Sequence, residues 1–162
     1  MASSNFISKL NWRLIIIHTI ACGFFIYGFK VFVYLHDHDF WFRMETADLT
    51  SVSIKRITTN LRLGTYSGFA GLFVGFIISL IVSLVRKWYW LNPVIVLLLS
   101  FSLLQYNLYG WGFLKHIFLL PGSVFSDYTK YIITNGMVLL LIGGLLFFLK
   151  PVAKFINAGQ VK

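Results

Sequence analysis

The sequence has few charged residues and very few acidic ones. Only 12% of its 162 residues are charged, about half the share found in an average soluble domain. Five residues are acidic, and none of them lies within a long apolar segment. Proton-coupled transporters and pumps generally place a titratable carboxylate inside the membrane. The lack of one in this sequence therefore disfavours that functional class.

Cysteine and catalytic motifs are also scarce. Cys22 is the single cysteine, which excludes an intramolecular disulfide and a thiolate metal cluster. The sequence contains no nucleophile–base motif, phosphate-binding loop, HExxH motif or pair of catalytic carboxylates. We therefore expect a protein that is not an enzyme and holds no cofactor. The positive charge is spread along the chain rather than gathered in a basic, aromatic-rich domain, so we expect no nucleic-acid partner.

Apolar residues dominate what is present. Hydrophobic residues make up 58% of the chain, and the mean hydropathy is +0.80. Four continuous apolar segments approach or exceed the roughly 20 residues that cross a bilayer as a helix; they are residues 14–35, 65–85, 93–111 and 128–149. Their continuity excludes the alternating pattern of a membrane β-barrel. The sequence predicts an all-α integral membrane protein, with one membrane domain over residues 1–162 that forms a four-helix bundle.

Charge predicts the orientation of these helices. Lysines and arginines divide equally between the two sides, but the short linker RKWYWLN is basic without an acid, and all five acids fall on the opposite side. We therefore expect both termini in the cytoplasm. The absence of glycosylation sequons, disulfides and organelle signals favours a bacterial inner membrane.

The first outer linker, residues 36–64, is long enough to have its own structure. Its apolar residues near 49–61 can share one face of a short amphipathic helix on the membrane surface. Lys55, Arg56 and Arg62 would then lie toward another face, beside lipid headgroups. The alternation in TSVSI, residues 50–54, leaves a short strand as the alternative.

Small residues recur every four positions in the second apolar segment, at Ser67, Gly71, Gly75, Ser79 and Ser83. This spacing places them on one ridge of a helix, where another backbone can approach closely. The sequence alone allows two interpretations, which are packing within the bundle and contact with another chain.

A few polar residues interrupt the apolar segments. Lys30 lies five residues before Leu35, so its ammonium can reach the interface, or it can serve as a buried functional cation. Gln105, Asn107 and Asn135 can hydrogen-bond between helices. Alternatively, together with Tyr109 and Lys30, they line a polar pocket near the outer leaflet.

The stretch YLHDHDFWFRME, residues 34–45, follows the first apolar segment. His36 and His38 are weak metal-ligand candidates, because a metal site needs three or four ligands at fixed geometry. A hydrated collar at the membrane surface is the favoured interpretation. Haem with two histidine ligands is not expected, because His18 lies near the other side of the membrane from the remaining histidines.

These patterns favour a non-enzymatic accessory or partner-binding subunit of a larger membrane complex. Its expected partners are membrane lipids and either other membrane subunits or copies of itself. One alternative is a lipid- or quinone-binding membrane protein that uses the polar pocket. A further alternative is an oligomeric channel or a membrane-disrupting effector.

Overall fold

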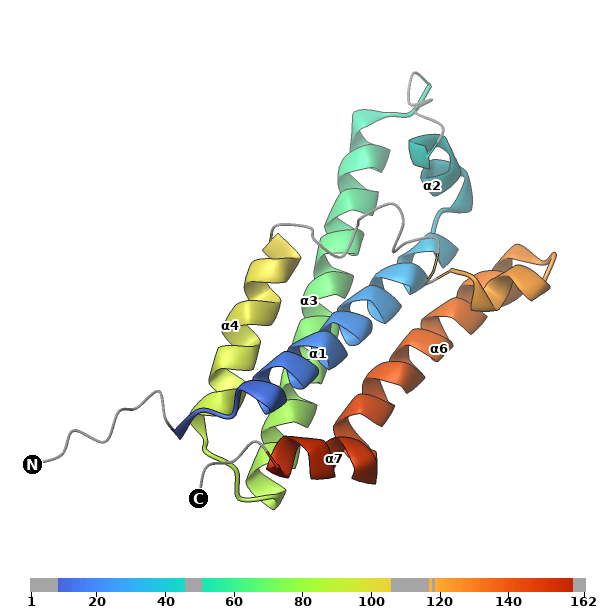
Figure 1. Ribbon diagram of the computed structural model, residues 1–162. Helices are drawn as coiled ribbons and strands as arrows, with labels where there is room; N and C mark the ends of the chain where they lie inside the picture. Colours follow the sequence, from blue (N-terminus) through green and yellow to red (C-terminus); the bar gives the residue numbers. More distant parts are fainter. Residues whose placement is uncertain (1–8, 46–50, 106–116, 118, 159–162) are drawn as a thin grey trace, which may run out of the picture.

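A computed structural model describes residues 9–45, 51–105, 117 and 119–158 of the protein, and all regular elements in these residues are helical. In chain order they are α1 (Trp12–Phe32), the 3₁₀ turn η2 (Val33–Leu35), α2 (His38–Glu45), α3 (Ile54–Val85), α4 (Leu91–Gln105), the 3₁₀ turn η4 (Pro121–Val124), α6 (Tyr128–Phe148) and α7 (Lys150–Asn157) (Figure 1). The alternative of a strand at 50–54 is not supported within the described part of that range, where Ser53 is the N-cap of α3.

The first long helix, α1, is the centre of the bundle. It packs against α3, α4 and α6, and Figure 1 shows it running through the middle of the molecule. Leu14, Ile15, Ala21, Cys22 and Ile26 on this helix are completely buried. The core is therefore formed around α1, and the other long helices expose their far faces.

Within the residues that the structure describes, three helical segments are long and apolar enough to cross a bilayer: Trp12–Leu35, Ile54–Val85 and Tyr128–Phe148. Two of them coincide closely with the predicted spans 14–35 and 128–149. The fourth apolar helix, α4, has 15 residues and is about 22 Å long, which is less than the roughly 30 Å hydrocarbon core. The predicted end of that span at Trp111 lies outside the described residues.

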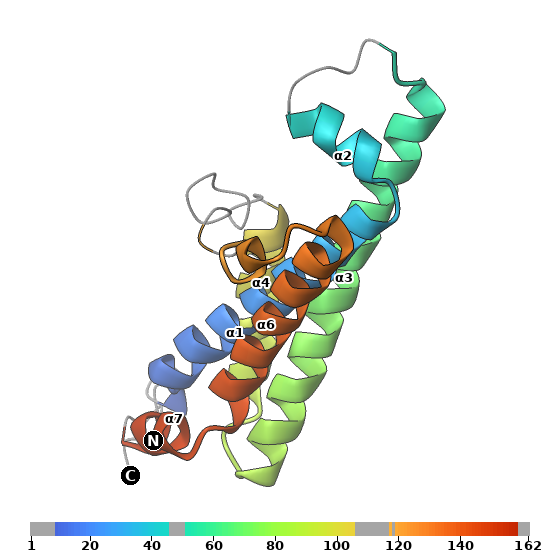
Figure 2. The same ribbon diagram turned by 90° about the vertical axis from the view of Figure 1, so that its right-hand side faces the viewer.

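The helix α3 begins far earlier than the predicted span at residue 65. It is continuous from Ile54 to Val85, so the prediction of a separate interfacial helix ending near residue 62 is wrong. Ser53 starts the helix by accepting a hydrogen bond from the Arg56 N–H at 3.3 Å. No proline lies within residues 54–85 to interrupt the helix. The short separate helix of this linker is α2, and both views show it packed beside the projecting start of α3 (Figures 1 and 2).

The opposite end of the bundle is crossed by α7, a helix that the sequence analysis did not predict (Figure 2). Leu149 breaks away from α6 with an extended backbone, and Pro151 occupies the first turn of α7. Ile156 of α7 is buried in the same core cluster as Leu14, Trp88 and Phe147. This packing fixes α7 across the ends of the longer helices.

Candidate functional site

The most elaborate polar structure joins α2 to the start of α3. We call this unit, α2 together with residues 37 and 54–64, the α2 platform. The Asp37 carboxylate accepts two hydrogen bonds from the Arg56 guanidinium, one of them from Nε to Oδ2 at 2.7 Å. It also accepts hydrogen bonds from Asn60 Nδ2 at 2.8 Å and from the Phe40 N–H at 3.2 Å. One carboxylate thus caps α2 and ties it to α3.

A second aspartate extends this network. Asp39 accepts a hydrogen bond from Arg43 Nε at 3.0 Å and lies 3.1 Å from Nη2 of Arg56. Arg43 in turn donates to the Ser51 hydroxyl at 2.9 Å. The hydrogen bond from Arg56 holds the pKa of Asp37 well below its usual range, and the one from Arg43 lowers the pKa of Asp39. Both carboxylates are therefore charged at neutral pH.

This hydrogen-bond network determines the contacts of the HDHD stretch, residues 36–39. Both aspartates face arginines, while the His38 ring lies against the Tyr128 ring of α6, with centroids 3.7 Å apart. His36 is exposed. Among the described residues, no three histidine, cysteine or carboxylate side chains are close enough to hold a metal ion. In this part of the chain, the stretch acts as a structural junction.

Aromatic packing makes the platform rigid. Phe40 is completely buried, and the Trp41 ring packs against Phe40 and Tyr34 with centroids 5.0 Å away in each case. The same ring lies close to Gly64 of α3, where an added Cβ would be in ordinary contact with it at 3.6 Å. Apolar side chains are nevertheless exposed on the same unit: Phe42 is 59% exposed and Ile54 is 82% exposed.

The predicted small-residue ridge faces α1. A Cβ on Gly71 would lie 2.6 Å from the Phe25 carbonyl oxygen, and one on Gly75 would lie 3.0 Å from Cys22 Sγ. Ser79 and Ser83 are buried and Ser67 is half-buried. Ser79 Oγ lies 2.7 Å from His18 Nδ1. Within this chain, the ridge is therefore the contact between α3 and α1.

The residues of the predicted polar pocket have separate surroundings. Asn135 is buried, and its Oδ1 accepts a hydrogen bond from the Gly122 N–H at 2.6 Å, which holds η4 against α6. Lys30 is half-buried, with its stem 3.6 Å from the position of a Cβ on Gly68. Gln105 is exposed at the end of α4. Asn107 and Tyr109 lie outside the described residues.

Sequence reasoning missed a second polar cluster, at the end of the bundle where α7 lies. The Asn11 N–H donates to Asn92 Oδ1 at 3.1 Å, and Asn11 Nδ2 donates to the Ile156 carbonyl at 2.9 Å. Trp88 Nε1 donates to Asn157 Oδ1 at 3.0 Å. The signal in the sequence was the four-residue spacing of Val152 and Ile156 and of Lys150 and Lys154, which is typical of an amphipathic helix.

No protein family, curated protein or solved structure matches this chain. The function is therefore inferred from its own geometry and chemistry.

Proposed function

We propose that this protein is a non-enzymatic accessory subunit of a membrane complex and that it binds another membrane protein through the α2 platform. The observation that carries the proposal is the combination of a rigid polar junction with exposed apolar side chains on one projecting unit. Exposed apolar surface that is fixed in place is typical of a protein-binding surface.

The length of α3 supports a position of the platform outside the hydrocarbon core. Its 32 residues extend about 48 Å, whereas the core is roughly 30 Å thick. With Arg86 and Lys87 at one interface, about 20 residues reach the other interface near Tyr66. Residues 54–64, including the charged Lys55 and Arg62, then extend into the headgroup region and the water beyond it. Lipid headgroups are additional partners for these two basic residues.

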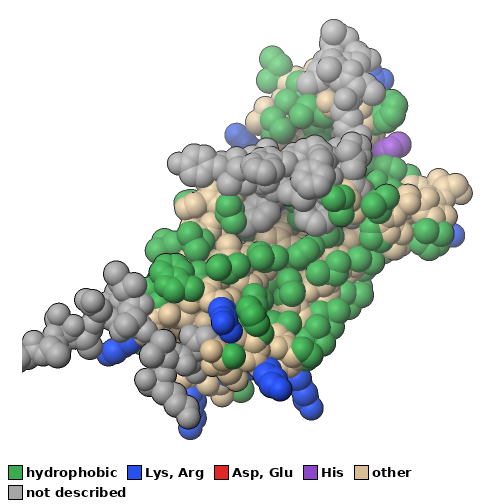
Figure 3. Space-filling view, viewed as in Figure 1, with side chains coloured by type: hydrophobic (Ala, Val, Ile, Leu, Met, Phe, Trp, Pro, Cys, Tyr) green, Lys and Arg blue, Asp and Glu red, His purple; other side chains and the backbone are tan. Residues whose placement is uncertain are grey.

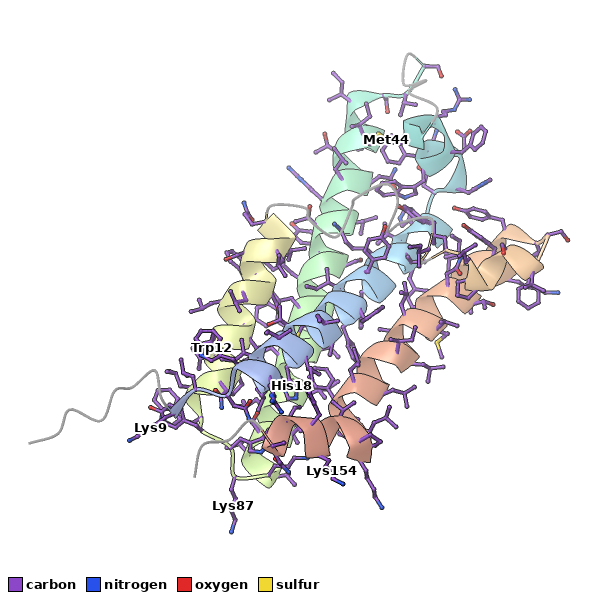
Figure 4. The ribbon with its side chains drawn as sticks, in the orientation of Figure 1. Lys9, Trp12, His18, Met44, Lys87 and Lys154 are labelled. Carbon is purple, nitrogen blue, oxygen red and sulfur yellow. The ribbon has the colours of Figure 1, made fainter. Side chains whose placement is uncertain are left out.

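The proposed topology has four spans, with α4 as part of the third, in a bacterial inner membrane with both termini in the cytoplasm. The distribution of basic residues supports this orientation. The short linker RKWYWLN, residues 86–92, is dense in positive charge and lies at the end of the bundle where Lys87 and Lys154 point outward (Figure 4). A short basic loop of this kind is expected to be cytoplasmic.

Native mass spectrometry after gentle extraction from the native membrane tests the proposed function. We expect the wild-type protein to carry a foreign membrane polypeptide at fixed stoichiometry. In the double variant Phe42→Ser/Ile54→Ser, the amount of bound polypeptide that is lost is expected to be at least ten times the amount lost in a control variant. Val124→Ser/Phe125→Ser is a matched control, since it removes exposed apolar side chains from the η4 region instead.

The outcome has a clear opposite. A mass that corresponds only to one or more copies of this chain, with or without lipid, would contradict an accessory role. Equal loss of the partner in both double variants would show that the α2 platform is not the binding surface.

A further inference from the structure

Hydrogen bonds fix α7 rigidly at the end of the bundle. Asn11 Nδ2 donates to the Ile156 carbonyl at 2.9 Å, and Arg13 Nη1 donates to the Phe155 carbonyl at 3.2 Å. The Trp88 indole, from the turn between α3 and α4, donates to Asn157. Groups from two separate segments, the start of α1 and the turn after α3, thus hold one short helix. The orientation of its faces is therefore set by the fold.

The faces of α7 differ in chemistry. Ile156 is buried and Val152 half-buried, whereas Lys150 and Lys154 are exposed. The two lysines are four residues apart and so share the face opposite to the packed one. Figure 4 shows Lys154 and Lys87 pointing away from the bundle at this end. On the face shown in Figure 3, Lys and Arg side chains gather there, and no acidic side chain is in view.

An apolar groove lies on the exposed face of α6, in the half of that helix that precedes α7. It has a volume of about 280 Å³ and is lined by Met137, Leu140, Leu141, Gly144, Leu145 and Phe148. The groove is open at Gly144, where an added Cβ would meet no atom within 4 Å. From Met137 to Phe148 it extends about 16 Å along the helix, which is about half of the hydrocarbon core and therefore one leaflet.

We propose that this end of α6 and α7 binds an anionic phospholipid of the adjacent leaflet. One acyl chain lies in the groove beside Gly144, and the phosphate lies against Lys150 and Lys154. The polypeptide sequence places the phosphate of the ligand near this end of the groove, because Lys150 comes two residues after Phe148, the last residue that lines the groove. The lysines select a negatively charged headgroup, and the groove selects an acyl chain. The proposal does not depend on the α2 platform or on its partner.

The charge contribution can be estimated. A lysine near an anionic membrane surface favours binding by about fivefold at moderate ionic strength. Two lysines together give a preference of roughly 25-fold for phosphatidylglycerol over zwitterionic phosphatidylcholine of the same acyl chains. The groove contributes equally to both lipids, so it raises the affinity without changing this ratio.

Native mass spectrometry of the purified protein with either lipid added measures both contributions. We expect Lys150→Gln/Lys154→Gln to abolish the preference for phosphatidylglycerol. We expect Gly144→Leu to reduce binding of both lipids several-fold, since its Cβ would meet no atom within 4 Å and its larger side chain would occupy the groove. Lys130→Gln, at an exposed lysine near the opposite end of α6, is the control for loss of charge. Ala70→Leu, at another exposed helical position, is the control for added bulk. Both controls should bind lipid as the wild type does.

Three results would overturn the proposal. One is equal retention of the two lipids by the wild-type protein. Another is unchanged phosphatidylglycerol binding in Gly144→Leu, and the last is an equal loss of preference in the Lys130→Gln control. Thermal unfolding of every variant in detergent without added lipid shows that each is folded, so that a loss of binding is not a loss of structure.

Discussion

The contact between α3 and α1 leads to a graded prediction from three glycines. A Cβ on Gly71 would lie 2.6 Å from the Phe25 carbonyl oxygen and 2.7 Å from the Ile26 Cα. Carbon atoms in favourable contact are about 3.5–4.0 Å apart. Both obstructing atoms belong to the backbone, so no side-chain rotation can relieve the clash. Gly71→Ala must instead move the two helices apart by about 1 Å.

The magnitude follows from known effects of overpacking. Added methyl or methylene groups in a tightly packed core typically lower stability by about 1–3 kcal/mol, and replacing glycine by alanine within a helix returns up to about 1 kcal/mol. We expect Gly71→Ala to lower the free energy of unfolding by about 2 kcal/mol. Gly75→Ala should have a smaller effect, because its nearest obstruction is the Cys22 side chain at 3.0 Å, with the Cys22 Cα at 3.1 Å.

Gly144→Ala provides the matched control. It makes the same substitution in a long apolar helix, but its Cβ would meet no atom within 4 Å. We expect its stability to equal or slightly exceed that of the wild type. Gly75→Leu, which adds three further carbons to the tight contact, is expected to prevent stable accumulation.

The assay is unfolding of the purified protein by SDS in mixed micelles, followed by tryptophan fluorescence, with Trp88 buried in the native core. Stability should increase in the order Gly71→Ala, Gly75→Ala, wild type. A Gly71→Ala protein as stable as Gly144→Ala would refute the reasoning. It would mean that the ridge does not pack against α1 and is free to meet another chain.

Four other predictions concern three polar contacts. Asp37→Asn should raise hydrogen exchange of the α2 amides about tenfold, because it weakens the charged link to Arg56; an unchanged rate would exclude that role. Because the pKa of Asp37 is lowered, its contribution to the stability of α2 is present above about pH 4 and is lost only as the pH falls further. Protection of the wild-type α2 amides should therefore be constant from pH 8 to pH 5. A decline within that range would contradict this assignment. Ser79→Ala should lower the free energy of unfolding, measured by the SDS titration, by about 1 kcal/mol, because the contact with His18 is lost. A variant more stable than the wild type would show that the pair does not stabilise the fold. Asn135→Ala should lower the free energy of unfolding by about 1–3 kcal/mol, because the buried Gly122 N–H loses its acceptor. Equal stability of this variant and the wild type would show that the position of η4 does not depend on this hydrogen bond.

The sequence predicts the elements whose signal is hydropathy. The segments Trp12–Leu35 and Tyr128–Phe148 differ from their predicted bounds by two residues or fewer, because each apolar run ends close to where its helix ends. The start of α3 could not be found in this way. Its first turns are polar, so hydropathy does not mark them as part of a long helix. Only the Ser53 cap and the lack of proline indicate that the helix begins at Ile54.

The contacts of the candidate site required the tertiary structure. Asp37 and Arg56 are 19 residues apart, and nothing in their local sequence specifies the pairing, since other acids and bases lie in the same linker. The sequence also could not show whether the small-residue ridge packs within the bundle or against another chain, because both contacts have the same pattern of small residues. The short α7 was missed because eight residues are too few for a membrane span, although its i, i+4 pattern was readable.

The two ends of the bundle are held by different chemistry, and this difference bears on their proposed roles. The α2 platform depends on partly exposed ion pairs such as Arg43–Asp39, which salt and competing charges weaken. The α7 end depends on hydrogen bonds from Asn11 and Trp88, which carry no net charge and are little affected by salt. Binding of a protein partner through the platform should therefore weaken at high salt, because salt weakens the ion pairs that hold its exposed apolar side chains in place, whereas α7 should keep its lysines in a fixed position. Apolar side chains held in place for a protein partner and a fixed pair of lysines for lipid headgroups are the properties that the two proposals require.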